Sequence, residues 1–252
     1  KSYDFIFWAD ATEGSPYTFS SGTKSVVVSY EDLSANNEKR DAFFQAVKDL
    51  EISGPMQQPV ELRRPLAQLN LLTSDLAAVT AAGTAVNKVD VTVKGLRNAL
   101  NLYTGIATGD ETLTFTAEGL PGQKFTIDDT DYDYLSMNYL LTGAELEADD
   151  VQTAKRELME AIATVTFDAV DGKTTTIEVP NMPVQRNWRT NIYGALLTSP
   201  LDLTIDVMPE FFEPDNDLEL SSKVPAVDAS GNILLTSVAE LEYIRSMVNA
   251  GT

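Results

Sequence analysis

Short runs of alternating apolar and polar residues, separated by Gly, Pro and Asp, extend over most of the chain. The clearest is KVDVTVKGL at residues 88–96, in which Val89, Val91 and Val93 would lie on one face of a strand. Alternation rich in aromatic and β-branched residues also predicts strands in SYDFIFWAD at 2–10, KSVVVSYEDL at 24–33 and TTTIEVPNMPV at 174–184. Many short strands with regular turns predict a mainly β protein with a sandwich architecture.

Four stretches have the period of an amphipathic helix instead. Asn36 or Asn37 would cap the first, Ser74 the second and Ser237 the last. The four predicted helices are NNEKRDAFFQAVKDL at 36–50, SDLAAVTAAG at 74–83, DDVQTAKRELMEAIATV at 149–165 and TSVAELEYIRSMVNAGT at 236–252. The polar, turn-rich residues 213–232 predict a linker before the last of them.

One segment, PVQRNWRTNIYGALL at 183–197, is unusually rich in polar side chains for a strand. If it is a single strand, Val184, Arg186, Trp188, Thr190 and Ile192 face one way, while Gln185, Asn187, Arg189, Asn191 and Tyr193 face the other. Neither face is cleanly apolar. We expect Trp188 and Ile192 to reach the core and the Arg and Asn side chains to hydrogen-bond backbone carbonyls that turns leave unpaired.

The composition is that of a globular protein, but its charge is strongly unbalanced. Hydrophobic residues make up 43% of the 252 positions and charged residues 22%, which argues against wholesale disorder. The 38 Asp and Glu exceed the 18 Lys and Arg, giving a formal net charge of −20. This charge repels phosphate backbones and anionic lipid, so we expect no nucleic-acid partner. No apolar run approaches the roughly 20 residues that span a bilayer.

The sequence lacks the usual chemistry of an active site. Without histidine there is no Ser-His-Asp triad, no His base and no His-ligated metal, and without cysteine there is no thiol chemistry or disulfide. Two carboxylates could still hydrolyse a glycoside, but nothing selects a pair among so many acids. The acids of TIDDTDYDY at 126–134 lack the Gly and Glu of a calcium-binding loop, so we interpret them as a solvated turn. We therefore expect no enzyme activity, no cofactor and no metal.

The arginines of LRRP, residues 62–65, have two interpretations. They could bind an anion, or pair with neighbouring carboxylates at a sheet edge. Because acids outnumber bases about two to one, we favour the ion pairs for Arg63 and Arg64. Pro65 forbids helix continuation and favours extended backbone at Arg64.

Several stretches together resemble the fimbrillin (type V pilin-like) proteins of Gram-negative gut and oral anaerobes. The main one is NMPVQRNWRTNIYGALLTSPLDLTIDVMPEF at 181–211, and YDFIFWADA, RDAFFQAV, VELRRPLAQLNLLTSDL and YDYLSMNYLLTG agree in the expected order. The resemblance covers most of residues 2–212. It implies two transthyretin-like β-sandwich domains, which we place at 1–68, lacking its first strands, and at 69–212, followed by a linker and helix at 213–252.

The resemblance also implies a function. Fimbrillins are exported lipoproteins, anchored at the cell outer membrane through an upstream cysteine, and some polymerise into a fimbria by donating a β-strand to a neighbour. The N-terminal KSYDFIFWAD does not read as a signal peptide and begins inside an apparent strand, so we expect upstream sequence. The last helix resembles one that precedes right-handed β-helix repeats in large surface proteins. This chain would then be the base of a longer adhesin.

These patterns lead to one main hypothesis and one alternative. The main hypothesis is a non-enzymatic pilin-like protein for cell adhesion whose partners, other fimbrial subunits or surface proteins, bind through strand exchange. Its architectural residues would be Arg63, Arg64, Pro65, Arg186, Trp188, Arg189 and Asn191. The alternative is a glycan-binding module of a surface uptake system, in which Tyr132, Tyr134 or Tyr139 stack on sugars of host or dietary glycans.

Overall fold

The computed structural model describes residues 1–143, 156–167, 173–198, 203–208, 226–227 and 233–234. The chain divides into two compact units, Lys1–Phe211 and Phe212–Thr252. In the second unit the short strands β16 (Ala226–Val227) and β17 (Ile233–Leu234) pair antiparallel. The predicted helix at 236–252 lies outside the described residues, and the division into three domains stays a prediction.

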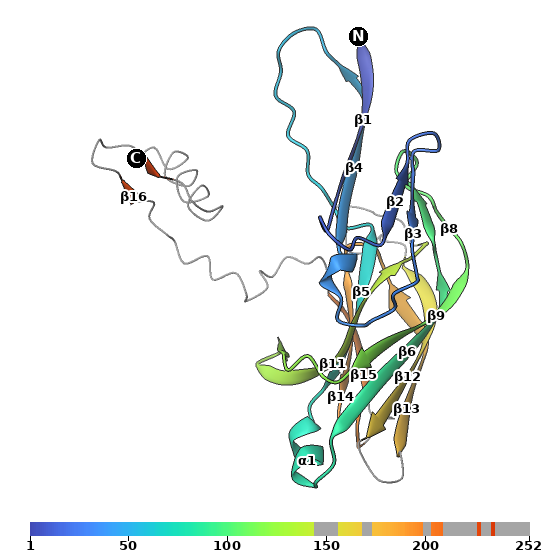
Figure 1. The fold of residues 1–252 in the computed structure, drawn as a ribbon, viewed down its shortest axis with the longest axis vertical. Coiled ribbons are helices and arrows are strands. Elements are labelled where there is room, and N and C mark those ends of the chain that lie inside the picture. Colours follow the sequence, from blue (N-terminus) through green and yellow to red (C-terminus); the bar gives the residue numbers. More distant parts are fainter. Residues whose placement is uncertain (144–155, 168–172, 199–202, 209–225, 228–232, 235–252) are drawn as a thin grey trace. The chain divides into compact units, whose positions relative to one another are not determined.

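Two packed sheets form the body of the first unit (Figure 1). One has the order β10-β11-β5-β14-β15, and the other has the order β13-β12-β6-β9. All neighbours are antiparallel except β5 and β14, which are parallel. The strands of the first sheet are β10 (Lys124–Ile127), β11 (Thr130–Leu141), β5 (Leu66–Thr73), β14 (Arg189–Gly194) and β15 (Leu203–Met208). Those of the second are β13 (Thr174–Val184), β12 (Glu157–Phe167), β6 (Val86–Leu96) and β9 (Glu111–Glu118).

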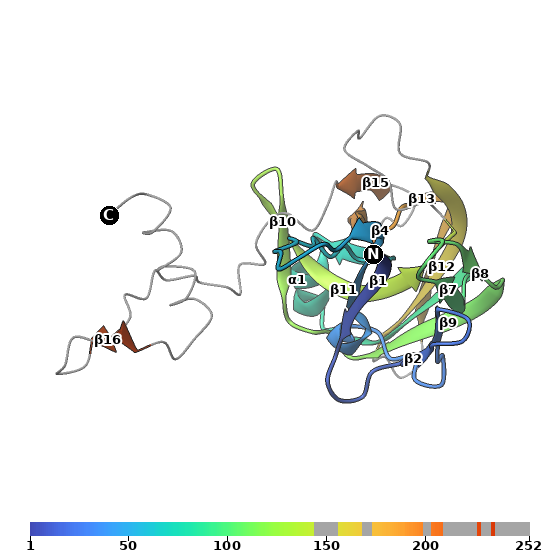
Figure 2. The same cartoon turned by 90° about the horizontal axis from the view of Figure 1, so that it is seen from above.

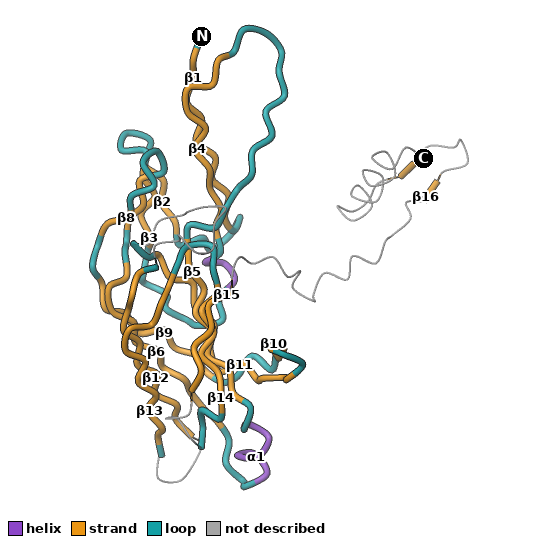
Figure 3. The backbone as a smooth tube through the Cα atoms, turned by 180° about the vertical axis from the view of Figure 1, so that it is seen from behind, coloured by secondary structure: helices purple, strands orange, loops and turns teal. Residues whose placement is uncertain are grey.

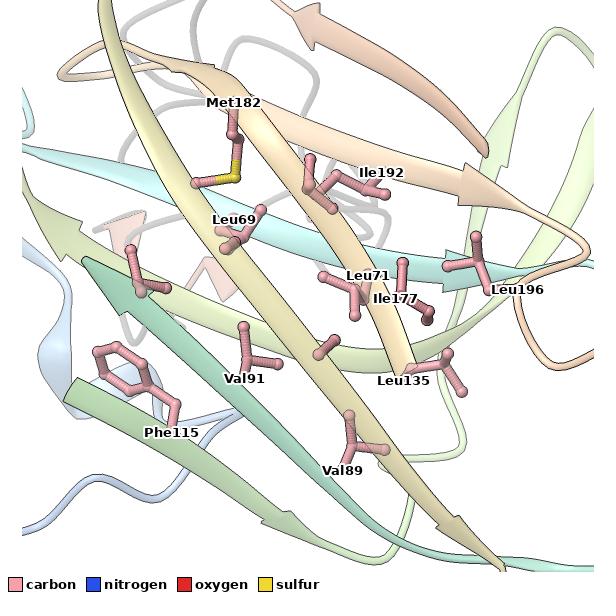
Figure 4. Packing of buried hydrophobic residues seen from close by; sticks show 14 of the residues in the cluster. Leu69, Leu71, Val89, Val91, Phe115, Leu135, Ile177, Met182, Ile192 and Leu196 are labelled. Atoms are coloured by element: carbon pink, nitrogen blue, oxygen red, sulfur yellow. The ribbon is translucent and has the colours of Figure 1, made fainter. Parts of the chain in front are cut away.

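The main core fills the space between these two sheets. Val89, Val91 and Val93 of β6 are fully buried on one face, as their alternation predicts. Leu69 and Leu71 of β5 reach the same layer from the opposite sheet (Figure 4). Burial of each such side chain stabilises the fold by about 1.5–3 kcal/mol. The prediction of a mainly β protein is confirmed.

A second group of strands lies at one end of the sandwich. One sheet has the order β2-β3-β7-β8, and β1 pairs with β4 as a two-stranded ribbon (Figures 1 and 3). The strands are β1 (Ser2–Asp10), β2 (Tyr17–Ser20), β3 (Ser25–Val28), β4 (Ala42–Glu51), β7 (Ala99–Asn101) and β8 (Ala107–Thr108). Together with the ends of β5 and β11 they enclose a small core made of Val26, Val28, Ala42, Phe44, Leu66, Leu100, Leu102, Met137, Tyr139 and Leu141.

The helix predicted over 36–50 is wrong beyond its first turn. Only Glu38–Arg40 is helical, as a single 3₁₀ turn in which the Asn37 side chain accepts the Lys39 N–H. The chain then enters β4, which pairs with β1 over its whole length. Both faces of this ribbon carry apolar side chains, so strict alternation is lost and the remaining pattern mimics a helical period. Pairing with β1 overrides the local pattern.

The helix predicted over 149–165 is also wrong where the structure describes it. Glu157–Phe167 is strand β12, flanked by β13 and β6, and residues 149–155 lie outside the described part. Every second residue from Met159 to Phe167 is buried, which is a strand pattern hidden among helix-favouring Ala, Glu and Met. The helix predicted over 74–83 is confirmed as α1 (Leu76–Ala81), at the end of the unit opposite β1 (Figure 3). The predicted Ser74 cap is wrong, because Asp75 occupies the N-cap position and makes no side-chain capping bond; its carboxylate accepts hydrogen bonds from Thr73 and Thr198 instead.

We expect the main core to dominate stability. Replacing Leu69 with Ala should lower the free energy of unfolding by about 2–5 kcal/mol, because it leaves a cavity between two sheets. Leu158→Ala, at a position 63% exposed, should change it by no more than about 0.5 kcal/mol. Urea unfolding followed by tryptophan fluorescence measures both. Equal losses from the two variants would contradict this placement of the core.

Candidate functional site

A groove of about 570 Å³ lies beside β4 in the first unit. Phe44, Gln45, Ala46 and Lys48 of β4 form one wall, and residues 102–107, between β7 and β8, form the other. Gly143 and Arg186 complete the lining. Viewed from above, β7 and β8 lie to one side of β4 (Figure 2).

The wall made by β4 is a strand edge whose pairing stops early. One edge of β4 pairs with β1. On the other edge, Phe44 donates its N–H to the Arg63 carbonyl at 2.9 Å and accepts the Arg63 N–H at 3.1 Å. Because backbone groups alternate between the edges of a strand, the N–H of Ala46 points the same way as that of Phe44. Among the described residues, no backbone hydrogen bond continues this edge beyond Phe44.

The opposite wall is also an edge. In the sheet β2-β3-β7-β8, strand β8 is last, and among the strands that the structure describes it pairs with β7 alone. The carbonyls of Ile106 and Thr108 accept N–H groups from Asn101 and Asn98, both at 2.9 Å, so the backbone groups of Ala107 between them face away from β7. The groove is therefore bounded by the edge of β4 on one side and, on the other, by the turn 102–106 and the first residue of β8, and small residues, Ala46 and Ala107, line it on both sides.

The lining of the groove combines two apolar residues of the small core, Phe44 and Leu102, with the buried guanidinium of Arg186, and its rim is cationic and aromatic. At the rim, the ammonium groups of Lys24 and Lys48 lie 4.1 and 4.4 Å from the centroid of the Tyr103 ring. These cations stand out in a chain of net charge −20. The exposed Ile106 adds an apolar side chain at the mouth.

Hydrogen bonds to Asp4 hold the β1–β4 ribbon against the β3 and β7 strands at this rim. The carboxylate of Asp4 accepts the backbone N–H of Asp49 at 2.9 Å and the hydroxyl proton of Tyr103. The Asp49 hydrogen bond lowers the pKa of Asp4, and the Asp4 carboxylate raises the pKa of Tyr103. Asp4 is exposed and Tyr103 is half-buried, so these hydrogen bonds orient the ribbon more than they stabilise the fold.

Arg186, one of the residues predicted from sequence, lies beneath the groove. It is 2% exposed, and its Nη1 and Nε donate to the carbonyls of Gly105 at 2.6 Å and Thr142 at 3.1 Å. These bonds tie the 102–107 wall to the end of β11. The segment around it is not the single strand expected: β13 ends at Val184, residues 185–188 turn with Asn187 at a φ of 64°, and β14 begins at Arg189.

Among the other residues of this segment, the two apolar ones lie in the core as expected, while Arg189 and Asn191 make contacts that the pattern did not predict. Trp188 and Ile192 are buried. The guanidinium of Arg189 lies 5.7 Å from the centroid of the Phe125 ring. Asn191 accepts a hydrogen bond from the buried Asn70 at 2.8 Å, across the parallel pair β5 and β14. Asn70 was missed from sequence, although a polar residue inside the apolar run LAQLNLL was its signal.

Arg63, Arg64 and Pro65 lead into β5. The Nε of Arg64 contacts both carboxylate oxygens of Asp41, at 2.9 and 3.0 Å. Burial raises the pKa of Asp41 against the opposing effect of Arg64. Arg63 contacts Glu61 at 3.4 Å. The expectation that both arginines pair with carboxylates is confirmed, while an architectural role for the seven predicted residues stays a prediction.

The three candidate glycan-stacking tyrosines do not form an exposed coplanar platform. Tyr139 is 5% exposed, and its hydroxyl donates to Glu38 at 2.8 Å. Burial raises the pKa of Tyr139. Tyr132 packs edge-on against Tyr193, with an interplanar angle of 70°, and Tyr134 packs edge-on against Phe125, at 77°. Sugar stacking needs a free ring face, so this arrangement gives no support to the glycan alternative.

The acidic stretch at 126–134 contains the turn of the β10–β11 hairpin. Asp128 and Asp129 have φ values of 48° and 60°, as in a two-residue type I′ turn. In the part of the chain that the structure describes, no group of acidic, His or Cys side chains is placed to hold a metal ion. No helix among the described residues is long and apolar enough to span a membrane.

A smaller hollow, of about 270 Å³, lies under α1 and is lined by Ala78, Val79, Ala82, Thr84, Phe167, Lys173, Thr175, Leu197 and Thr198. Beside it, the carboxylate of Asp75 accepts hydrogen bonds from the Thr73 hydroxyl and from the N–H (2.9 Å) and hydroxyl (2.7 Å) of Thr198. Partial burial raises the pKa of Asp75, but these hydrogen bonds outweigh it and hold the pKa below its ordinary value.

The fold is thus a β-sandwich extended at one end by a small sheet and a ribbon. Residues 1–235 match a family of unknown function, DUF6562, and the chain belongs to this family. No curated protein matches the sequence.

Among solved structures, a candidate cell adhesion protein from Bacteroides uniformis ATCC 8492 is similar, with 14% identity over 82% of this chain and 72% of its own, and a TM-score of 0.46. A candidate adhesin from Bacteroides thetaiotaomicron VPI-5482 shares 12% identity over 82% and 75%, with a TM-score of 0.44. A candidate adhesin from Bacteroides ovatus ATCC 8483 matches 71% of this chain at 10% identity, with a TM-score of 0.39. The match spans 64% of the length of that adhesin. Likenesses this distant assign no function to this chain.

Arg186 should be needed for stability. Arg186→Leu leaves the carbonyls of Gly105 and Thr142 without this donor, so it should lower the free energy of unfolding by at least about 2 kcal/mol. Lys94→Leu, which removes an exposed ion pair with Glu160, should cost no more than about 1 kcal/mol. Urea unfolding compares them. Wild-type stability in Arg186→Leu would show that the arginine is not architectural.

Asp75 should make stability depend on pH. Its folded-state pKa lies below the unfolded value of about 3.9, so its contribution is present above that pH and is lost as the pH falls through the folded pKa. Asp75→Asn should therefore melt below wild type at neutral pH, with a difference that shrinks in acid. Asp128→Asn, in the exposed hairpin turn, is the control. A gap between wild type and Asp75→Asn that stayed constant with pH would refute this.

Proposed function

We propose that this chain is a non-enzymatic, structural or adhesive protein of the cell surface that docks on other surface proteins by accepting a β-strand. The observation that carries the proposal is the groove between the open edge of β4 and the turn that leads from β7 into β8, with Phe44, Leu102 and Ile106 in its lining. An unpaired strand edge beside apolar pockets is the arrangement used in β-augmentation, where main-chain hydrogen bonds give affinity and alternate side chains give specificity.

An incoming strand would continue the β1–β4 ribbon. Its backbone would bond to the edge groups of Ala46, and every second side chain would enter the groove above Phe44 and Leu102. The small side chains of Ala46 and Ala107 leave room there for a bulky apolar residue. Lys48 and Lys24 at the rim favour an acidic residue on the incoming strand.

The cellular setting of the proposal comes from the sequence. The stretches that resemble fimbrillins include the segment holding Arg186, which ties down one wall of the groove. We therefore place the protein at the outer membrane surface, anchored through a lipid on an upstream cysteine, within a fimbria or a longer adhesin. The absence of histidine and cysteine from the sequence supports a role without catalysis.

The groove should select extended apolar peptides. Immobilised full-length chain should enrich, from a phage-displayed library of random peptides, sequences with apolar residues at alternate positions. Ala46→Pro removes a groove-facing N–H without touching the bonds to β1, and Ala107→Phe fills the hollow. Each should weaken binding of an enriched synthetic peptide by at least about tenfold, or about 1.4 kcal/mol, in fluorescence anisotropy.

Ala81→Phe is the matched control, because Ala81 is exposed on α1 at the far end of the unit and should leave peptide binding unchanged. Enriched peptides that bind all three variants equally would place the binding site elsewhere. A library that yields no enriched peptide would sink the strand-accepting function itself.

A further inference from the structure

The ribbon carries a second unpaired edge, on β1. Strand β1 pairs with β4 on one side, and within the described residues no strand pairs with its other side. Residues 5–9 of this strand, FIFWA, contain no charge and no proline. Edge strands of this kind are normally protected by Lys, Pro or a bulge, because an open edge is a template for pairing with another chain. The one register shift of the ribbon, between Tyr3 and Phe5, places its extra residue in β4 and not in β1.

A row of aromatic rings runs along the outward face of β1. Tyr3, Phe5 and Phe7 follow one another with ring centroids 6.3 Å apart, and the rings of Phe5 and Phe7 are inclined by only 22°. Tyr3 is 45% exposed and Phe7 is 37% exposed. On the inward face, Ile6 and Trp8 pack against the small core. The exposed row is therefore additional to what the fold needs.

The pairing of β4 shows which residues of β1 direct their backbone N–H and carbonyl groups to the open edge. Phe44 uses its N–H and carbonyl with Arg63, so Phe44 and its neighbour in register, Trp8, are not bonded to each other. The backbone groups of Trp8, and by alternation those of Ile6 and Asp4, therefore face the open edge. The groups of Phe5 and Phe7 are used within the ribbon.

We infer that two copies of this chain associate by pairing their β1 strands antiparallel, with the two-fold axis passing through Phe5. Phe5 then lies opposite Phe5 of the second copy, and Tyr3 lies opposite Phe7 of the second copy. These are pairs without mutual hydrogen bonds, in which side chains approach most closely. Asp4 lies opposite Ile6, so no two like charges meet, and the two ribbons form a four-stranded sheet.

The strand is self-complementary in this register, which favours a second copy over another partner. A two-fold axis at Asp4 would set two carboxylates against each other. An axis at Ile6 would leave Tyr3 opposite Ala9, and an axis at Trp8 would leave Phe7 opposite Ala9. Only the axis at Phe5 matches every ring of the row with a ring. Isologous pairing of one surface with itself is the usual way in which identical chains form dimers.

The net charge of the chain should make this dimerisation depend on salt concentration. Each copy has a net charge of −20, so the copies repel at low salt. Screening should strengthen the dimer as NaCl rises from about 0.01 M to about 1 M, over which the Debye length falls from about 30 Å to about 3 Å. The surface is separate from the groove beside β4, so the dimer does not depend on strand acceptance there.

Two experiments test the dimer with the full chain. Because the chain has no cysteine, Phe5→Cys can form only an intermolecular disulfide, and mild oxidation should convert it to a covalent dimer. Phe19→Cys, at another exposed edge-strand phenylalanine, should remain monomeric. In sedimentation equilibrium the wild type should dimerise more tightly at high salt, while Phe7→Lys should be monomeric and Phe19→Lys should behave as wild type.

Charge pairing at the two-fold axis tests the register. Phe5→Lys and Phe5→Glu should each be monomeric alone and should form a heterodimer when mixed. Ala107→Phe, which fills the groove, should leave the wild-type dimer intact, so loss of peptide binding and loss of dimerisation are distinguishable. A wild type that stays monomeric at every salt concentration, or a dimer that survives Phe7→Lys, overturns the inference.

Discussion

The complete burial of β5 is the constraint on which the rest of the structure depends. All eight residues from Leu66 to Thr73 are buried: the strand is paired on both edges, Leu69 and Leu71 face the main core, and Leu66 on the other face belongs to the small core. A strand buried on both faces cannot be repositioned without disturbing both. Its parallel partner β14 follows all four strands of the second sheet in the sequence. Pairing with β5 therefore also fixes the position of the 185–188 turn and of Arg186.

The narrowness of the β1–β4 ribbon produces the exposed edges. In the part of the chain that the structure describes, the sandwich body pairs nine strands in two sheets, whereas β1 and β4 form a sheet of two strands, beside the ends of β5 and β11 that complete the small core. A ribbon two strands wide leaves open backbone on both of its sides. The groove beside Ala46 and the aromatic row on β1 are the two consequences. The lysines gathered at the groove rim give one of these edges a charge preference that the rest of this acidic chain lacks.

Secondary structure was predictable from the sequence where one face of an element is buried and the other is exposed to solvent. The alternation of Val89, Val91 and Val93 identified β6, and the Ala-rich stretch that ends at Gly83 identified α1, although not its N-cap residue. Prediction failed at β4 and β12, because a ribbon with two apolar faces and a strand built from Ala, Glu and Met both imitate helices. The pairing of Arg64 with a carboxylate was predictable from charge balance. The groove was not, since it depends on pairing that stops at Phe44, which no local pattern records.

Amide hydrogen exchange in the free protein, read residue by residue by NMR, tests the strand-accepting edge most directly. Gln45 and Val47 lie in register with Phe7 and Phe5 of β1, and their N–H groups should be strongly protected. The N–H of Ala46, which points into the groove, should exchange far faster than either neighbour. Protection of Ala46 equal to that of Gln45 and Val47 would mean that the edge is already paired, and would contradict the account.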